Sequence, residues 1–421
     1  MLSIRIHAVC LVGLLACATA AFAQQGPSWP QFLGPQRNGV SAEKGVTNGW
    51  ASDADAPKQV WRVPGGVGMS GLAVADGRVI TLGQGEGKQY VLALAEMTGK
   101  TLWKTPVAPA YENSMGDGPR ATPTIDGKTV YAYTGEGVLT ALDAASGELL
   151  WRVDAVRENE SRVSDYGMAS SPLVVGDKVI VTVGAPGPTV VAYNKKSGEA
   201  AWQAGGAPNG YSSPALLEVG GAKQIVVFAG AAGLGVSPAD GALLWRYPYV
   251  TDYNCNTATP IAVGGDVFLS SGENHGSVLL SLTGKNSGGF DVKPVWESLG
   301  GGSVMRNEWQ TSVLVDGYLY GFDNVGSAGP VTHLTCIEAA SGKPMWRQAR
   351  FGKGNLIYAD GKLLISTFDG DFVVVRASPK EFNELGRMTA TDGTRQAPSL
   401  ADGRVYLRDN REVVCLDVRA K

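Results

Sequence analysis

The stretch from Arg120 to Trp151, RATPTIDGKTVYAYTGEGVLTALDAASGELLW, contains the pattern that decides the fold. Its β-branched and aromatic residues fall into four short runs, at 123–125, 129–133, 138–143 and 149–153. Turn-forming residues separate them: Asp-Gly follows the first run, Gly-Glu-Gly the second and Ser-Gly the third. This alternation of short strands and tight turns predicts a small sheet of four antiparallel strands.

Copies of this unit recur along the chain and are marked most clearly by tryptophan. Four strands in each unit of about 48 residues are typical of a propeller blade. The tryptophan of each unit lies in the fourth, outermost strand, where we expect it to cover the gap to the neighbouring blade. We therefore interpret seven tryptophans as structural docking residues. They follow one another at separations of 42 to 51 residues: Trp61, Trp103, Trp151, Trp202, Trp245, Trp296 and Trp346.

The two ends of the repeated region predict how the ring closes. Residues 57–63, which include Trp61, resemble a fourth strand standing alone, whereas residues 397–418 contain three strands and then stop. Joining them gives one complete blade, which removes the free strand edges of an open array. With seven further units, the sequence predicts an all-β, eight-bladed propeller with four-stranded blades, formed as one domain by residues 57–421. Seven blades are the alternative.

Residues 1–23 have the pattern of an export signal. They contain one basic residue, Arg5, then an apolar run over 8–21 and a small-x-small ending at Ala23. This predicts a cleaved signal peptide and a periplasmic or secreted protein. In the alternative interpretation, Cys17 is acylated and anchors the chain to lipid. No later stretch approaches the ~18 apolar residues of a membrane-spanning helix, so we expect no transmembrane span.

Residues 24–56 carry few strand signals and several Gly, Pro and Asn residues. We expect this segment to wrap the outside of the propeller, with Trp29, Phe32 and Trp50 as its anchors.

The composition excludes several classes of function. The 36 basic and 39 acidic residues give a net charge of −3, which argues against nucleic-acid binding. Only three histidines are present, so a His-rich metal site is excluded and a Ser-His-Asp triad is disfavoured; we predict no metal site and no catalytic residue. Outside the signal we predict single thiols at Cys255, Cys336 and Cys415, and one long-range disulfide is the alternative. We expect a monomer.

Two motifs resemble a known family. The spacing Ala141-x-Asp143-x-x-x-Gly147-x-x-x-Trp151 is similar to the tryptophan-docking motif of the PQQ-repeat propellers. That family includes quinoprotein alcohol dehydrogenases and the non-enzymatic outer-membrane-assembly lipoprotein BamB. The segment Trp29-Pro-Gln-Phe-Leu-Gly-Pro35 also resembles the lead-in of secreted PQQ-like propellers of planctomycete-type bacteria. The resemblance implies the propeller fold, and the chain is closest in kind to the BamB-like and secreted members.

The resemblance also implies where a cofactor would bind. The dehydrogenases of the family hold PQQ and Ca²⁺ in the central funnel, and many carry a disulfide between adjacent cysteines beneath the cofactor. This chain has no adjacent cysteines, and the Glu, Asn and Asp ligands of the family's calcium ion cannot be matched to its residues. We therefore predict no cofactor. PQQ and Ca²⁺ are expected only if the chain is an oxidoreductase.

The topology of a propeller places the residues that precede each innermost strand around one mouth of the channel. Polar, aromatic and arginine side chains at this mouth suit an anionic or sugar-like ligand, or an acidic peptide. Alternatively, these groups only hydrate the channel mouth. Residues 111–118 are expected to overhang the same face. The candidate ligand-binding residues are Arg120, Tyr211, Asn256, Arg306, Asn307, Glu308, Trp309, Asn355 and Arg395, and the same reading adds Met69 and Met168 to the rim.

The sequence thus favours an exported, non-catalytic propeller that binds an envelope protein or a small polar ligand at its channel face, as an outer-membrane assembly factor would. The alternative is a PQQ- and Ca²⁺-dependent alcohol or sugar oxidoreductase with a divergent cofactor site.

Overall fold

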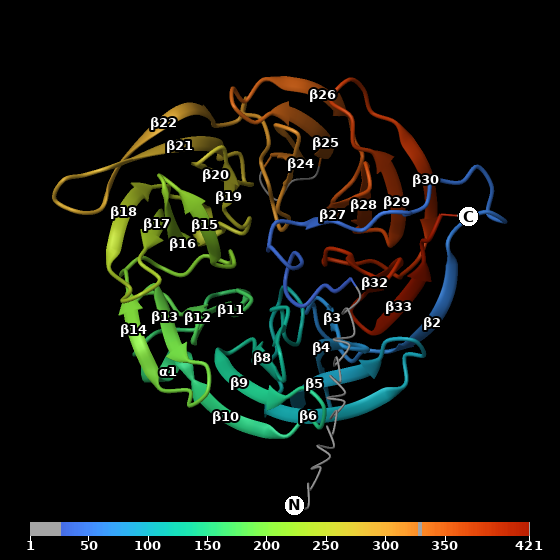
Figure 1. Ribbon diagram of the computed structural model, residues 1–421, viewed down its shortest axis with the longest axis horizontal. Coiled ribbons are helices and arrows are strands. Elements are labelled where there is room, and N and C mark those ends of the chain that lie inside the picture. Colours follow the sequence, from blue (N-terminus) through green and yellow to red (C-terminus); the bar gives the residue numbers. More distant parts are fainter. Residues whose placement is uncertain (1–26, 327–330, 421) are drawn as a thin grey trace, which may run out of the picture.

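Eight β-sheets surround a central axis in the computed structural model, which describes residues 27–326 and 331–420 (Figure 1). The predicted signal peptide, 1–23, and the alternative acylation site, Cys17, lie outside the described residues. The stretch quoted above forms one sheet, made of β7 (Thr124–Asp126), β8 (Thr129–Tyr133), β9 (Val138–Asp143) and β10 (Leu149–Asp154).

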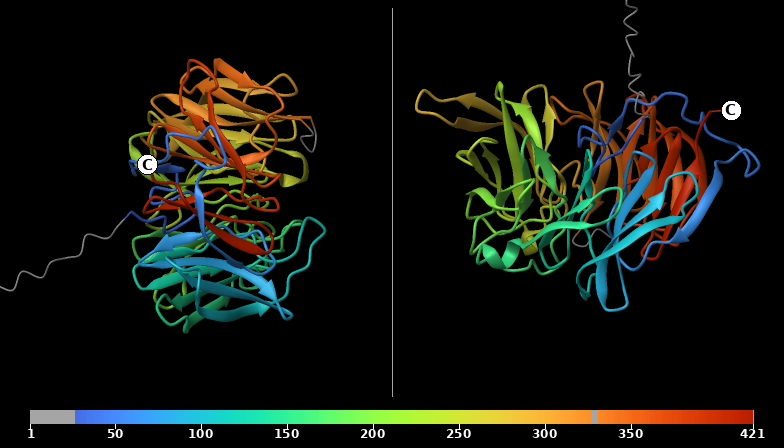
Figure 2. Two further views of the ribbon diagram at one scale, coloured as in Figure 1. Left: turned by 90° about the vertical axis from the view of Figure 1, so that its right-hand side faces the viewer. Right: turned by 60° about the horizontal axis from the view of Figure 1, so that its bottom comes forward.

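Five further sheets repeat this plan with consecutive antiparallel strands. The first consists of β3 (Ala73–Ala75), β4 (Arg78–Gly85), β5 (Lys88–Ala95) and β6 (Thr101–Pro109). Two more comprise β11 (Leu173–Val175), β12 (Lys178–Thr182), β13 (Val190–Asn194) and β14 (Ala200–Ala204), then β15 (Ala215–Val219), β16 (Ala222–Ala229), β17 (Ala232–Val236) and β18 (Leu243–Pro248). The last two comprise β19 (Ile261–Val263), β20 (Asp266–Ser271), β21 (Gly276–Gly284) and β22 (Phe290–Leu299), then β23 (Val313–Val315), β24 (Tyr318–Val325), β25 (Val331–Glu338) and β26 (Pro344–Gln348). The β21–β22 hairpin projects beyond its neighbours (Figure 2).

The remaining two sheets use the N-terminal part of the chain. One contains β27 (Gly354–Ala359), β28 (Lys362–Thr367), β29 (Asp371–Arg376) and β30 (Glu384–Thr389), with β1 (Val40–Ser41) added parallel to β27 as a fifth strand. The other joins β2 (Lys58–Pro64) to β31 (Ser399–Ala401), β32 (Arg404–Arg408) and β33 (Glu412–Asp417). Because β2 pairs antiparallel with β33, with Trp61 opposite Cys415, both ends of the chain share one blade. The eight-bladed prediction is confirmed, and the seven-bladed alternative is wrong.

Apolar side chains fill the gaps between neighbouring blades. Buried valines and tyrosines of β8, β12 and β13 form one such layer, and the next blade pair forms another. At the outer edge, an indole N–H from one blade donates to a backbone carbonyl of the next blade in six cases: Trp61 to Glu96, Trp103 to Ala144, Trp151 to Lys195, Trp202 to Pro238, Trp296 to Ala339 and Trp346 to Ser378. Trp245 differs, since it donates to Gln224 within its own blade.

The N-terminal segment does not lie wholly outside the ring. Trp29 is buried and exchanges two backbone hydrogen bonds of 2.8 Å with Val74 on an innermost strand. The buried Arg37 donates to the carbonyl of Pro172 at 3.0 Å, and β1 then pairs with β27. Residues 29–41 therefore cross the channel, as the blue trace shows (Figure 1). The expectation of an outer wrap was wrong for this part of the segment. Trp50, by contrast, packs on the outermost strand β30.

Helix is almost absent from residues 27–326 and 331–420, which contain only α1 (Ala155–Glu158) and the 3₁₀ turn η1 (Asp252–Asn254). Neither is long or apolar enough to cross a membrane.

Candidate functional site

A cavity of about 490 Å³ opens at the mouth of the channel where the innermost strands begin. Its volume lies within the range of small-molecule pockets, about 300–1,000 Å³. The loops that lead into the innermost strands form its walls. Phe32 and Leu33 line the deep end, because residues 29–41 meet the innermost strands further along, at Pro172 and Tyr358. The N-terminal segment thus contributes to the lining of the cavity.

The structure brings together six of the nine predicted site residues. These six line the cavity: Arg120, Tyr211, Glu308, Trp309, Asn355 and Arg395. Met69 lines it as well, and Met168 is buried behind it. Residues 111–118 reach the same mouth, where Met115 contributes to the wall. The other three predicted residues, Asn256, Arg306 and Asn307, are not among the lining residues and are buried.

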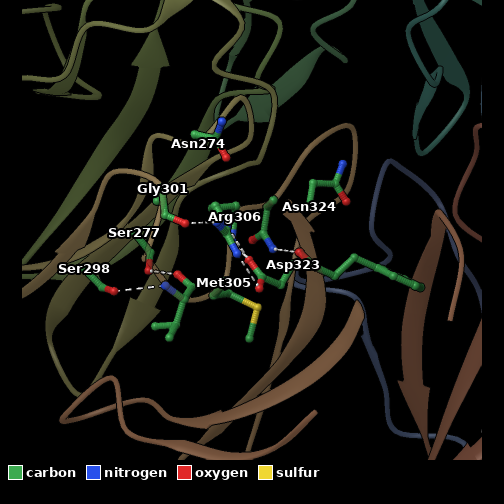
Figure 3. A network of polar contacts seen from close by, with 12 residues as sticks. Asn274, Ser277, Ser298, Gly301, Met305, Arg306, Asp323 and Asn324 are labelled. Atoms are coloured by element: carbon green, nitrogen blue, oxygen red, sulfur yellow. Dashed lines mark hydrogen bonds and ion pairs between the residues drawn. The ribbon is translucent and has the colours of Figure 1, made fainter. Parts of the chain in front are cut away.

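Arg306 is held in a buried ion pair with Asp323 (Figure 3). Its Nε and Nη2 donate to the two carboxylate oxygens of Asp323 at 2.7 and 2.9 Å, and its Nη1 donates to the carbonyl of Gly301 at 2.7 Å. The side chain of Asp323 is 0% exposed. The guanidinium therefore fixes the loop before β23 to β24 and does not face the cavity.

The two buried asparagines satisfy backbone groups in the same way. Asn307 donates to the carbonyl of Phe322 at 2.9 Å and accepts a hydrogen bond from Ser312 at 2.9 Å. Asn256 donates to the carbonyl of Ala229 at 2.7 Å. A buried carbonyl group without a hydrogen-bond partner would destabilise the fold. By satisfying such carbonyls, both amides stabilise the loops that form the cavity.

Arg120 is positioned by the loop that precedes it. Its Nε donates to the carbonyl of Tyr166 at 2.7 Å, Nη2 donates to the carbonyl of Gly116 at 2.6 Å, and Nη1 donates to the carbonyl of Gly118. The guanidinium also lies 4.7 Å from the ring centroid of Tyr111. Burial lowers the pKa of Arg120. Neutral partners dominate its hydrogen bonds, so it contributes positive charge to this wall.

Arg395 is the second cation of the wall. Its Nη1 donates to the carbonyl of Met115 at 2.6 Å and lies 3.4 Å from the sulfur of Met69. The guanidinium lies 5.1 Å from the ring centroid of Trp309. Burial lowers the pKa of Arg395, and within the described ranges no carboxylate pairs with it. A partly desolvated cation without a counter-ion favours an anionic group beside it.

Trp309 stands beside this cation in a strained backbone conformation. Its φ of +58° is in the left-handed region, which costs a bulky residue about 1–2 kcal/mol. The hydroxyl of Thr257 accepts its backbone N–H at 3.0 Å and helps to hold it there. The ring lies 4.6 Å from the ammonium of Lys353, which also pairs with Glu308 at 3.2 Å. Strain of this kind often marks a functional position.

The residues on the other side of the cavity were not predicted from the sequence. Tyr166, Tyr253, Cys255 and Glu273 line it, and the rings of Tyr166 and Tyr211 lie 5.6 Å apart. Tyr166 precedes the expected rim position by two residues, and Glu273 comes from a turn between the second and third strands of its blade. Turns at that level of each unit are the sequence signal that could have identified Glu273.

Comparison with known proteins agrees with this architecture. A family model described as outer membrane protein assembly factor BamB matches residues 87–348. The assembly factor BamB of Burkholderia pseudomallei (strain K96243) is 27% identical over 226 residues, which cover 51% of this chain and 54% of that protein. The chain spans between 54% and 60% of the length of the two BamB relatives that it matches.

Solved structures share the fold. BamB from Moraxella catarrhalis superposes with a TM-score of 0.61 at 14% identity, covering 86% of this chain and all of that one. Quinohemoprotein alcohol dehydrogenase from Comamonas testosteroni gives a TM-score of 0.70 at 15% identity, covering 94% and 81%. The predicted resemblance to PQQ-repeat propellers is confirmed. Since the family model matches more than half of its residues, this chain belongs to the PQQ-repeat propeller family described as outer membrane protein assembly factor BamB.

Proposed function

We propose that this protein is a non-catalytic binding scaffold of the cell envelope, and that the cavity at its channel mouth binds a small ligand with an anionic group. Membership of the BamB-like family supports the scaffold role. The description of that family as an outer membrane protein assembly factor supports a location in the envelope, and so does the predicted signal at 1–23. An envelope protein could offer the same anionic group from a loop or a chain end.

Arg395 is the observation that carries the ligand proposal. Its guanidinium lines the cavity and is partly removed from water, and among the described residues its hydrogen-bonding partners are a carbonyl and a thioether. Arg120 lies on the same wall. A carboxylate placed between them would form charge-assisted hydrogen bonds, each worth about 1.5–3 kcal/mol. Trp309 and Tyr211 offer flat apolar surfaces for the rest of such a ligand.

The donor set of the cavity does not fit the PQQ and Ca²⁺ of the dehydrogenases. Calcium requires six to eight oxygen ligands, usually from several carboxylates. One oxygen of Glu308 pairs with Lys353 and the other accepts from Asn324. Across residues 27–326 and 331–420, no group of three His, Cys, Asp or Glu side chains could hold a metal ion. These facts support a scaffold that works without this cofactor.

Replacing Arg395 by Gln tests the proposed anion site. We expect the unaltered protein to bind N-acetylphenylalaninate and to discriminate against the neutral N-acetylphenylalaninamide. In Arg395→Gln the affinity for the carboxylate should fall about ten- to hundredfold, because a charge-assisted hydrogen bond is lost. Titration calorimetry measures both. Arg152→Gln, on the outer strand β10, is the matched control and should change neither affinity.

Two results would overturn the proposal. Equal affinity of the unaltered protein for the carboxylate and the amide would remove the anion site. Tight binding of PQQ with Ca²⁺, together with dye reduction by alcohols or sugars, would replace the scaffold role with the oxidoreductase alternative.

A further inference from the structure

Three hydroxyl groups on consecutive blades lie in the wall of the cavity. Thr122, Ser171 and Ser213 line it and precede β7, β11 and β15, whose blades follow one another around the ring (Figure 1). The backbone N–H of Thr122 donates to the hydroxyl of Ser171 at 3.0 Å, and the N–H of Ser171 donates to the hydroxyl of Ser213 at 2.9 Å. These hydrogen bonds between blades hold the three side chains next to one another.

The O–H groups of these three residues are free to donate. The residues are only 3%, 2% and 4% exposed. A hydroxyl has one O–H donor in addition to its two lone pairs, and among the described residues none of the three hydroxyls donates a hydrogen bond. Because buried polar groups rarely stay without partners, these donors need acceptors inside the cavity. The oxygens of a ligand can supply them in place of water.

Two arginines place positive charge near these hydroxyls. Arg120 precedes Thr122 by two residues, so their Cα atoms are at most about 7 Å apart. The buried Arg37 donates to the carbonyl of Ser171 and to further neutral acceptors, and its Nε has no hydrogen-bond partner among the described residues. Burial lowers the pKa of Arg37 to about 9, so it stays charged near neutral pH. A buried cation whose partners are neutral favours an anion nearby.

The carboxylates that line the cavity belong to other blades. Glu308 precedes β23 and pairs with Lys353 at 3.2 Å. Glu273 lies between β20 and β21 and has an interaction of its own. None of the lining residues on the blades of β7, β11 and β15 or in the loops that precede these strands is acidic. This part of the wall therefore combines hydroxyl donors with positive charge.

We infer that the three hydroxyls and Arg120 form a subsite for the phosphate group of a phosphate monoester. This inference rests on the proposed function and names the class of its anionic ligand. A carboxylate has two oxygens, which Arg395 and Arg120 can bind at the rim. A phosphate monoester has three terminal oxygens and nearly two negative charges at neutral pH, so it also provides an acceptor for the hydroxyls and matches more of the positive charge. Tyr211 and Trp309 offer apolar surfaces to the organic group of the ester.

The test compares phenyl phosphate with phenylacetate, a carboxylate of similar size, by titration calorimetry in a phosphate-free buffer near pH 7.5. We expect the unaltered protein to bind phenyl phosphate at least tenfold more tightly. Thr122→Val removes a hydroxyl that has no hydrogen-bond partner among the described residues, and it leaves the N–H of residue 122 to donate to Ser171. The affinity for phenyl phosphate should fall about ten- to hundredfold, whereas that for phenylacetate should change less than about twofold.

Thr259→Val is the matched control. Thr259 precedes β19 by the same two residues, is 3% exposed, and has a hydroxyl without a partner among the described residues. It is not among the residues that line the cavity, so its replacement should change neither affinity. Inorganic phosphate is the third probe and should bind at least tenfold more weakly than phenyl phosphate, because it lacks the apolar ring.

The outcomes separate this inference from the proposed function. If phenyl phosphate binds no more tightly than phenylacetate, the phosphate inference is wrong while the anion site stands. Equal losses of phenyl phosphate affinity in Thr122→Val and Thr259→Val would show that the hydroxyl of Thr122 does not contact the ligand. If inorganic phosphate binds as tightly as phenyl phosphate, the assignment to a monoester is wrong. If no carboxylate and no phosphate binds, both the inference and the proposed function fail. A native-like far-ultraviolet spectrum of each variant excludes misfolding as the cause.

Discussion

Replacing Asp323 by Ala is expected to lower the free energy of unfolding by about 3–5 kcal/mol. Asp323 is 0% exposed and its two carboxylate oxygens bind the guanidinium of Arg306, whose side chain is 3% exposed. Removing the carboxylate would leave a buried cation whose side chain keeps, among the described residues, the carbonyl of Gly301 as its hydrogen-bond partner. The backbone N–H of Arg306 would lose its acceptor as well, because Asp323 accepts it at 3.1 Å. Chemical denaturation, followed by tryptophan fluorescence, measures the loss.

Two further variants show whether the uncompensated charge is the cause. The double variant Arg306→Met with Asp323→Leu removes both charges and should recover most of the stability lost in Asp323→Ala. Arg347→Ala removes the outer partner of Asp323, which lies at 3.4 Å and is 44% exposed, and should cost at most about 1 kcal/mol. If the double variant is as unstable as Asp323→Ala, the loss comes from packing and the electrostatic explanation is wrong.

Arg306 was predicted to face the channel but is buried against Asp323, and this difference shows which part of a candidate site a sequence can predict. The repeat predicts that each of these loops lies at the channel mouth, because the sequence of every unit determines its own order of strands and turns. Whether a loop side chain faces the channel depends on a partner from another strand. Here that partner is Asp323, a charged residue among the apolar residues of β24. A carboxylate at a buried strand position needs a cationic partner. Asp323 was therefore the sequence signal that could have predicted a buried arginine.

The N-terminal segment was harder to place for a different reason. Trp29, Phe32 and Trp50 are all apolar anchors, but they pack in different places: Trp29 against an innermost strand, Phe32 in the cavity and Trp50 on the outermost strand β30. Apolar character alone does not distinguish the inside of a ring from its outside. Arg37 reaches carbonyls on the blade of β11–β14, about 135 residues away, and no local pattern encodes that contact.

Replacing Trp61 by Ala is expected to lower the free energy of unfolding by about 3–5 kcal/mol. Trp61 is 7% exposed, donates its indole N–H to the carbonyl of Glu96 at 2.9 Å, and packs beside Tyr406 at 5.9 Å. It also lies in β2, the strand that closes the ring. Its loss weakens the contact between the closing blade and the first complete blade. Val60→Ala, at the adjacent 42% exposed position, is the control and should cost less than about 1 kcal/mol.

Gly99 provides an independent test of the same contact from the neighbouring blade. A Cβ on Gly99 would lie 2.8 Å from the ring of Trp61, and the φ of Gly99 is +68°. Gly99→Ala should therefore destabilise the unaltered protein through both the steric clash and the unfavourable backbone conformation. In the Trp61→Ala background the clash with the ring disappears and only the contact with Val63 at 3.0 Å stays tight. The cost of Gly99→Ala should therefore fall toward the backbone contribution, about 1–2 kcal/mol. Additive effects of the two substitutions would mean that Trp61 does not pack against Gly99 in solution.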